Sequence, residues 1–280
     1  MLLYRRPPWW HLKVLMRILV TFAVEAEFAP WRKRHDFDSI SMPTPIGLES
    51  YSFYRGRVFE NDVDVLLTGI GWDENKGGNR PRFVLRELLR IKPDVCITSG
   101  LAGGLRADLK CGDIVAATEV SVRTGGDTFR SSVNLLVLAK DAGAKVGLKQ
   151  ITETHIVLEA SAKSALANFA DFVDMEGYHI LQIVSGTRIP AISVRAISDT
   201  RDTDLPPEIG KLVDHEGHVR TISLLKLVMK RPVRIPALLT FGAQSRAAAA
   251  GLADFLDRFL EIAGGSRSEA QAKREAVAAQ

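Results

Sequence analysis

Short apolar runs alternate with amphipathic segments along most of the 280 residues, and this alternation constrains the fold more than any other feature. Runs rich in Val, Ile and Leu at 17–23, 94–99 and 113–120 are typical of buried strands. Between them, apolar residues at helical spacing predict helices at 26–34 and 80–91. Strands and helices in this order indicate an α/β fold with a sheet covered by helices on both faces.

The same pattern continues along the rest of the chain. Two runs at 51–59 and 62–68 flank Glu60 and Asn61, which predicts a hairpin. The alternation is expected to continue through 151–158, 160–169, 176–185 and 191–197, followed by closing helices at 219–229 and 236–262. No internal repeat and no linker interrupts this pattern, so a single domain is predicted.

The two ends of the chain differ from this pattern. Residues 1–15 are basic and aromatic, whereas Met16 opens directly into the first predicted strand. Arg17 interrupts the apolar stretch that a signal peptide would need, so we expect 1–15 to be an upstream extension or an over-long gene prediction, non-native or disordered. The domain is then expected at 16–262, with 263–280 as a flexible tail rich in Ala, Ser, Glu, Arg and Gln.

Composition narrows the function classes. The two cysteines, Cys96 and Cys111, form no CxxC pair, and no histidine cluster has metal spacing. Neither a disulfide framework, a metal nor a cofactor is therefore expected, and a reducing cytoplasm fits. The net charge of +4 is spread over scattered basic residues, which disfavours nucleic acid as a partner. No run of 18 apolar residues occurs, so no membrane span is predicted.

Four segments place polar residues or glycines just after predicted strands, where open α/β sheets bind ligands. These segments are 23–27 (AVEAE), 68–71 (TGIG), 98–104 (TSGLAGG) and 173–177 (VDMEG) with 195–199 (RAISD). Glu27 fits a general base or an acid that the helix dipole favours. Asp199 fits a partly desolvated general acid or a helix N-cap. The glycines permit backbone N–H groups to face a ligand, and a plain turn fits them too.

Together, the order of these segments resembles the purine nucleoside phosphorylase superfamily, and within it the 5′-methylthioadenosine/S-adenosylhomocysteine nucleosidases. The resemblance covers roughly 17–199 and includes KPDVCITSGLAGGL at 92–105, GDIV at 112–115 and RIPAISVRAISD at 188–199. It implies a single-domain, three-layer phosphorylase/hydrolase-like α/β fold with a central mixed sheet. It also implies a homo-oligomer that cleaves the N-glycosidic bond of a small-molecule purine nucleoside, an adenosine derivative.

The resemblance implies roles for the matching residues. Asp199 is expected to protonate or hydrogen-bond N7 of the leaving purine, with Ser198 as its supporting neighbour. Glu27 is expected to orient and deprotonate the attacking water. Glu176 is expected to bind the ribose 2′- and 3′-hydroxyls, with Met175 packed under the sugar. The other residues expected to contact substrate are Gly71, Ser99, Gly100, Ala102 and Gly103.

The nucleophile is a choice between water and phosphate. Phosphorylases of this superfamily hold phosphate with arginines, one of them in the turn that matches 98–103, and this chain has no basic residue there. This favours hydrolysis, with phosphorolysis as the alternative. A non-catalytic nucleoside-binding protein is disfavoured because Glu27 and Asp199 are both present. A dinucleotide-binding fold is disfavoured because AVEAE, not a glycine motif, follows the first strand.

The C-terminal part departs from the compact nucleosidases. Leu-Pro-Pro at 205–207, the Arg-Pro…Pro-Ala-Leu-Leu run at 231–239 and a final amphipathic helix are similar to the branch that removes adenine from adenosylhopane in hopanoid biosynthesis. A basic segment at 226–234 then suggests peripheral membrane contact. Packing on the sheet or in a subunit interface is the alternative. The residues that stack on the base stay unassigned.

Overall fold

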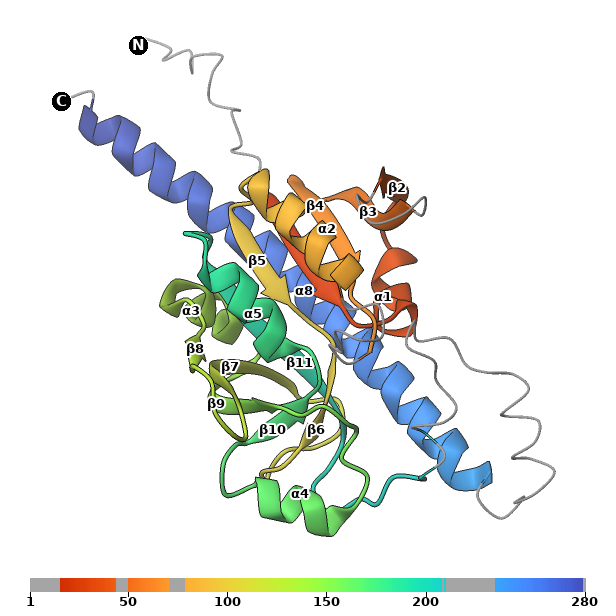
Figure 1. Cartoon of the computed structure of the whole chain (residues 1–280). Helices are drawn as coiled ribbons and strands as arrows, with labels where there is room; N and C mark the ends of the chain where they lie inside the picture. Colours follow the sequence, from red (N-terminus) through yellow and green to blue (C-terminus); the bar gives the residue numbers. More distant parts are fainter. Residues whose placement is uncertain (1–15, 44–49, 71–78, 208, 210–234, 279–280) are drawn as a thin grey trace.

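Eleven strands form one mixed sheet in this computed structural model, which describes residues 16–43, 50–70, 79–207, 209 and 235–278 (Figure 1). Their order is β2-β3-β4-β1-β5-β11-β6-β10-β9-β7-β8. The bounds are β1 Arg17–Phe22, β2 Phe37–Pro43, β3 Ser50–Val58, β4 Asn61–Leu67, β5 Val95–Thr98, β6 Leu101–Gly104, β7 Ile114–Val122, β8 Phe129–Arg130, β9 Lys145–Thr152, β10 Phe172–Asp174 and β11 Ala191–Asp199.

Two halves of the sheet meet at β5 and β11. In the first half, β1 runs parallel to both β4 and β5, and the β3–β4 hairpin and β2 extend its edge. In the second half, β11 pairs with β6 on one side and also with β7, while β6, β10, β9 and β7 pair in turn. These five strands therefore close into a ring. The ring removes the exposed edges that an open sheet would leave there.

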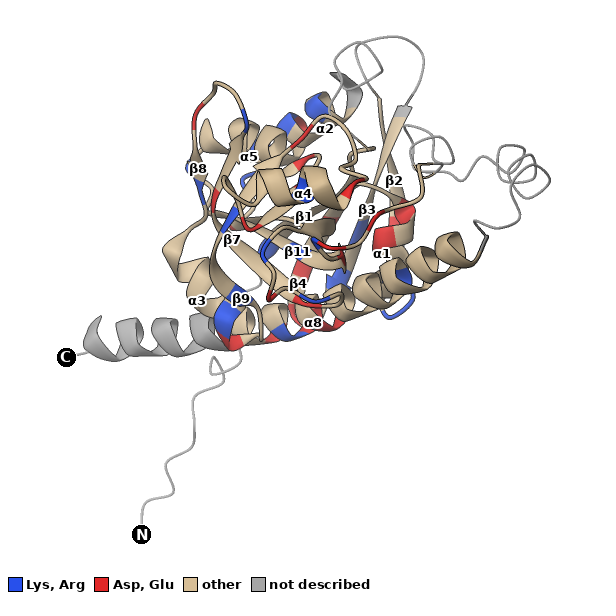
Figure 2. Ribbon diagram, turned by 90° about the horizontal axis from the view of Figure 1, so that it is seen from below, with Lys and Arg blue, Asp and Glu red and all other residues tan. Residues whose placement is uncertain are grey.

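Helices cover both faces of the sheet. On one face lie α2 (Asn79–Arg90) and α5 (Gly177–Ser185), whose apolar residues join a core around Leu19, Leu66 and Cys96. On the other face lie α1 (Glu25–Arg32), α3 (Val133–Asp141) and the long α8 (Ile235–Ala278). Figure 2 shows α8 along one side of the molecule with α2 and α5 on the other. The short α4 (Ala160–Leu166) follows β9. The three-layer α/β architecture predicted from the alternation is confirmed.

The parallel pairing positions the site. Because β1, β5 and β11 run in one direction, the chain leaves β1 and β5 at the same edge of the sheet. β11 continues past the end of β5 and pairs next with β6, with Ala196 opposite Leu101 and Asp199 opposite Gly103. The segments at 23–27, 98–104 and 195–199 are therefore neighbours in space although they are far apart in sequence.

The structure differs from the expected elements in several places. Residues 101–104, expected to be a turn, form β6, because glycines fit closely against β11: a Cβ on Gly104 would lie 3.3 Å from Cγ2 of Ile197. The segment expected at 151–158 begins earlier, since β9 ends at Thr152. Strands β2, β8 and β10 and helix α3 were not predicted. β8 and β10 have only two and three residues, and β2 is polar and mostly exposed, so the periodicity of these strands is weak.

The C-terminal helix also differs from its expected bounds. α8 does not end at residue 262 but continues to Ala278, so residues 263–278, expected to be a flexible tail, are helical. This tail contains many Ala residues together with Glu, Gln and Arg, all of which are strong helix formers. The helix expected at 219–229 and the basic segment 226–234 lie outside the described residues. Within the described ranges, no helix is long and apolar enough to cross a bilayer.

Candidate active site

Glu27 is a buried carboxyl group at the start of α1, directly after the carboxyl end of β1. Its Oε2 accepts a hydrogen bond from the backbone N–H of Ala23 at 2.9 Å, and its Oε1 accepts one from Leu101 N–H at 2.9 Å. Burial raises the pKa of Glu27, while these two backbone bonds and the charge of Arg195 act in the opposite direction. The result is a fixed, desolvated carboxyl group suited to accept a proton.

Asp199 is the second buried carboxyl group, at the last position of β11. Ser198 Oγ donates to Asp199 Oδ1 at 2.7 Å, and the fully buried Lys163 of α4 donates to Asp199 Oδ2 at 2.5 Å. Both oxygens are therefore held by donors on the protein side. The Ser198 hydroxyl thus bonds the carboxyl group of the residue that follows it, and its supporting role in catalysis stays a prediction.

A single glycine-rich segment touches both carboxyl groups. Gly100 has a φ of +149°, and a Cβ there would lie 3.0 Å from Oε2 of Glu27. A Cβ on Gly103 would lie 3.2 Å from Oδ2 of Asp199. Three residues of extended chain span roughly 10 Å. The two carboxyl groups are thus held against opposite ends of one short backbone segment.

Glu176 and Met175 follow the end of β10. Glu176 is buried and lies at the N-cap position of α5, and Met175 is half-buried. β10 is antiparallel to β6, with Val173 opposite Gly103. The chain after Val173 therefore runs back in the direction of Gly100, toward the Glu27 end of the segment.

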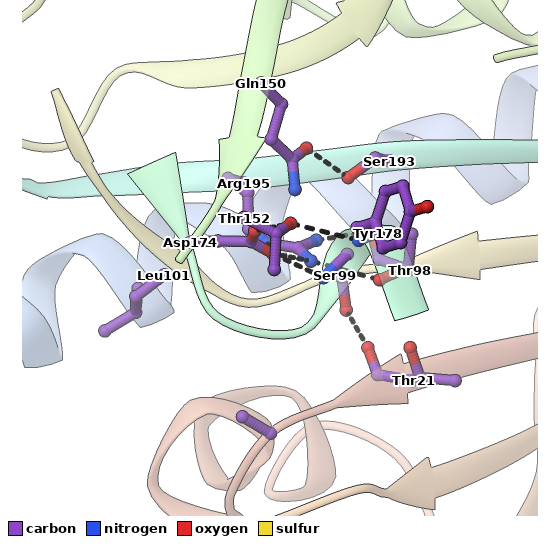
Figure 3. Close-up of polar contacts among 12 residues, drawn as sticks. Thr21, Thr98, Ser99, Leu101, Gln150, Thr152, Asp174, Tyr178, Ser193 and Arg195 are labelled. Carbon is purple, nitrogen blue, oxygen red and sulfur yellow. Dashed lines mark hydrogen bonds and ion pairs between the residues drawn. The ribbon is translucent and has the colours of Figure 1, made fainter. Parts of the chain in front are cut away.

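A buried ion pair between Arg195 and Asp174 connects the strands that carry these residues. Arg195 of β11 donates to Asp174 Oδ2 through Nε at 3.1 Å and Nη2 at 2.6 Å, and its Nη1 donates to Thr98 O at 2.7 Å (Figure 3). Asp174 also accepts from Thr152 Oγ1 at 2.6 Å and from Gly177 N–H at 2.7 Å. These bonds tie the ends of β5, β9 and β10, the start of α5 and the middle of β11 together.

The motifs found in the sequence include Asp174 and Arg195, but no role was predicted for either residue. Lys163 was not predicted to belong to the site. Charged residues within otherwise apolar strands are a signal for a buried pair, and Arg195 among Val194, Ala196 and Ile197 carries that signal. No comparable signal marks Lys163, because a lysine in a short amphipathic helix is ordinary. Only the fold brings this side chain to Asp199.

Three other expected contact residues have different placements. Ser99 donates its hydroxyl to Thr21 O at 2.8 Å, so this side chain bonds the sheet (Figure 3). Ala102 packs in an apolar core with Val115 and Ile197, and its carbonyl oxygen lies 3.2 Å from Ser198 Oγ. Any contact that Ser99 or Ala102 makes with substrate stays a prediction for their backbone atoms. Gly71 lies outside the described residues.

A hollow of about 1170 Å³ lies elsewhere, between the C-terminal halves of α2 and α5. Its lining includes Arg86, Arg90, Lys92 and Arg188 together with Pro190, which directly precedes β11. This is the amino-terminal edge of the parallel strands, opposite the edge that holds Glu27. Among the described residues, no group of three or more His, Cys, Asp or Glu side chains could hold a metal ion.

Comparisons with known proteins agree with this fold. Residues 17–153 match the family model of the phosphorylase superfamily. A curated 5′-methylthioadenosine/S-adenosylhomocysteine nucleosidase of Shewanella halifaxensis is 26% identical over 237 residues, which cover 76% of this chain and 99% of the relative.

Two solved structures share the fold. A futalosine hydrolase mutant of Helicobacter pylori has a TM-score of 0.64 at 18% identity, covering 89% of this chain and 100% of that one. A 5′-methylthioadenosine/S-adenosylhomocysteine nucleosidase of Neisseria meningitidis, in complex with methylthio-immucillin-A, has a TM-score of 0.64 at 21% identity, with coverages of 89% and 100%. The family match, the curated relative and these two folds confirm the resemblance of this chain to the phosphorylase superfamily.

Proposed function

We propose that this protein hydrolyses the N-glycosidic bond of a purine nucleoside, an adenosine derivative, with Asp199 acting on the base and Glu27 activating water. The observation that carries the proposal is the placement of two buried carboxyl groups, Glu27 and Asp199, at opposite ends of the segment 100–103. The curated relative, named as a nucleosidase, supports the same reaction class.

Hydrolysis of the N-glycosidic bond requires ionisable groups on both sides of the ribose. The purine leaves poorly as an anion, so a donor at N7 lowers the barrier. Positive charge then develops near C1′ in an oxocarbenium-like transition state, and carboxylates near it stabilise that charge. One turnover therefore needs a general acid at the purine and a general base at the attacking water. We assign the first role to Asp199 and the second to Glu27.

Glu176 completes the proposed site. It follows β10, which runs antiparallel to β6, and this direction supports a position toward the Glu27 end of the segment, where the ribose would lie between base and water. A carboxylate can accept hydrogen bonds from the 2′- and 3′-hydroxyls together. Met175, directly before it, is half-buried and would pack under the sugar.

Water is the favoured nucleophile because the buried cations around the site are already engaged. Arg195 is bonded to Asp174 and Thr98, and Lys163 is bonded to Asp199. In the described part of the site, neither side chain has N–H donors free to bind a dianionic phosphate. The carboxylate of Glu27 would also repel a phosphate anion bound beside it.

The experiment measures adenine release from methylthioadenosine, S-adenosylhomocysteine and adenosine by liquid chromatography, with and without phosphate. We expect release that does not need phosphate, and a loss of roughly 10²- to 10⁴-fold in kcat for Asp199→Asn and for Glu27→Gln. The matched controls are Asp202→Asn, an exposed neighbour of Asp199, and Glu25→Gln, on the same helix as Glu27. Both controls should keep the wild-type rate.

Other outcomes would change the proposal. Release only with phosphate, together with a ribose 1-phosphate, would make the protein a phosphorylase. Binding of the three nucleosides without cleavage would indicate a nucleoside-binding protein. Neither binding nor release from all three would exclude these substrates and point to a bulkier adenosyl compound such as adenosylhopane, presented at a membrane surface through the segment 226–234.

A further inference from the structure

Lys163 is a fully buried lysine whose three ammonium protons all have acceptors. The side chain is 0% exposed. Its Nζ donates to Asp199 Oδ2 at 2.5 Å, to Thr203 O at 2.8 Å and to Thr200 O at 3.2 Å. An ammonium group has three N–H donors, so the site satisfies it completely as a cation. Two of the acceptors lie in the segment that directly follows β11.

Burying this charge is costly unless it is paired. The penalty for taking one ion out of water is offset only by a close counter-ion and additional hydrogen bonds. Lys163 has both, which holds the pair as an ammonium and a carboxylate. Burial and, next, the negative charge of Asp199 raise the pKa of the neighbouring Cys111 thiol.

This pairing creates a difficulty for Asp199 as an acid. A carboxylate has no proton to give, and its second oxygen accepts from the Ser198 hydroxyl, which is not an acid at neutral pH. Within the described ranges, Lys163 of α4 is bonded to Asp199, and Cys111, in the turn before β7, lies close enough to feel its charge. The thiol donates to Ser198 O instead of to Asp199. The ammonium of Lys163 is therefore the proton source in direct contact with the carboxylate.

We propose that Lys163 is the positioning residue and proton reserve of Asp199, so that the proton delivered to the leaving purine passes from Lys163 Nζ through Asp199. The inference rests on the proposed function. Lys163 does not itself touch the substrate in this scheme. It fixes the plane of the carboxyl group and supplies the proton that the carboxylate lacks.

The step balances in atoms and charge. As the C1′–N9 bond breaks, its electron pair goes to the purine, N7 takes a proton from Asp199, and Asp199 takes one from Lys163. Water forms the new C1′–O bond and gives its proton to Glu27. The pair Lys163–Asp199 then carries one negative charge and Glu27 is neutral. After the products leave, Glu27 loses its proton to solvent and Lys163 regains one.

Two substitutions separate the proton reserve from simple packing. Lys163→Met keeps the length of the side chain but has neither charge nor proton. Lys163→Arg keeps the charge, and a guanidinium does not give up its proton in proteins. Lys140→Met, an exposed lysine on α3, is the control. Each variant is compared with wild type for folding by thermal unfolding, for adenine release from methylthioadenosine, and for cleavage of a 4-nitrophenyl riboside.

The nitrophenyl substrate is informative because nitrophenolate leaves without protonation. We expect both Lys163 variants to lose roughly 10²-fold or more in kcat for methylthioadenosine, as for a missing general acid, and to stay within about threefold of wild type on the nitrophenyl riboside. Equal losses on both substrates would overturn the proton role. Recovery of methylthioadenosine cleavage in Lys163→Arg would also overturn it and leave positioning alone.

A wild-type measurement protects the test against variants that fail to fold. The kcat for methylthioadenosine should fall at alkaline pH because its leaving purine needs a proton, whereas kcat for the nitrophenyl riboside should not. The same alkaline limb with both substrates would contradict the inference. The proposed function fails separately: it falls if wild type releases no adenine, and the Lys163 inference alone falls if wild type and Lys163→Met are equally active.

Discussion

Glu27 is subject to opposing influences on its protonation. Burial raises its pKa, and the N–H groups of Leu101 and Ala23 oppose that rise. A carboxyl group that must accept a proton from water works only in its ionised form. The pKa of Glu27 in the folded protein therefore decides how far into acid the activity extends.

We predict that the acidic limb of the kcat/KM profile lies above the ordinary glutamate pKa of about 4.3, because the pKa of Glu27 is raised. Below that limb Glu27 is protonated and the rate falls tenfold per pH unit. The measurement is adenine release from methylthioadenosine across the acid range. Glu25→Gln should keep the limb unchanged. A limb at or below the ordinary value would show that another group is the base.

At the scale of elements, the segment 100–103 joins the two carboxyl groups, and its backbone conformation matters more than its side chains. Gly100 has a φ of +149°, which only glycine adopts without strain. Its missing Cβ also makes room for the carboxyl group of Glu27. Residue 100 must therefore be glycine for two separate reasons: its backbone conformation and the space that the Glu27 carboxyl group occupies.

We predict that Gly100→Ala costs about 1–3 kcal/mol in the free energy of unfolding and lowers kcat at least tenfold, because the new Cβ displaces Glu27. Gly147→Ala is the matched control, since Gly147 has a φ of +83° and open space around its Cβ position. It should lose stability to a similar extent but keep its activity. Urea denaturation and adenine release measure the two effects. Full activity in Gly100→Ala would contradict the placement of Glu27 against this glycine.

At the scale of the whole molecule, α8 packs the C-terminal part of the chain against α1 and the core beside β1. Asp257 accepts hydrogen bonds from Trp31 Nε1 at 2.7 Å, and Asn61 Nδ2 donates to Leu260 O at 3.3 Å. Phe255 and Phe259 enter the same core as Phe22 and Phe28. The helix is therefore part of the domain that carries the site (Figure 1).

We predict that Phe255→Ala lowers the free energy of unfolding by about 3–5 kcal/mol, because it leaves a cavity in the core beneath β1 and β11. Leu239→Ala, on the same helix but 64% exposed, should change it by less than about 0.5 kcal/mol. Thermal or urea unfolding of both variants measures this. Equal effects would mean that α8 does not pack on the sheet as described.

Part of this fold was predictable because local sequence decides it. The strand at 17–22 and the hairpin of β3 and β4 have strong apolar patterns, and the structure confirms them. The helix α2 likewise follows its 3.6-residue period. By contrast, β10 is a strand of three residues, and β6 is formed by Leu, Ala and two glycines, so neither has a period long enough to recognise.

The sequence by itself determined the α/β class and the motifs that carry Glu27, Glu176 and Asp199, because apolar periodicity and short polar motifs are local properties of the chain. Only the tertiary structure decided that segment 100–103 touches Glu27 and Asp199 at its two ends, and that Lys163 pairs with Asp199. Those contacts join residues 36 to 96 positions apart. They depend on strand order, register and burial, which no local pattern encodes.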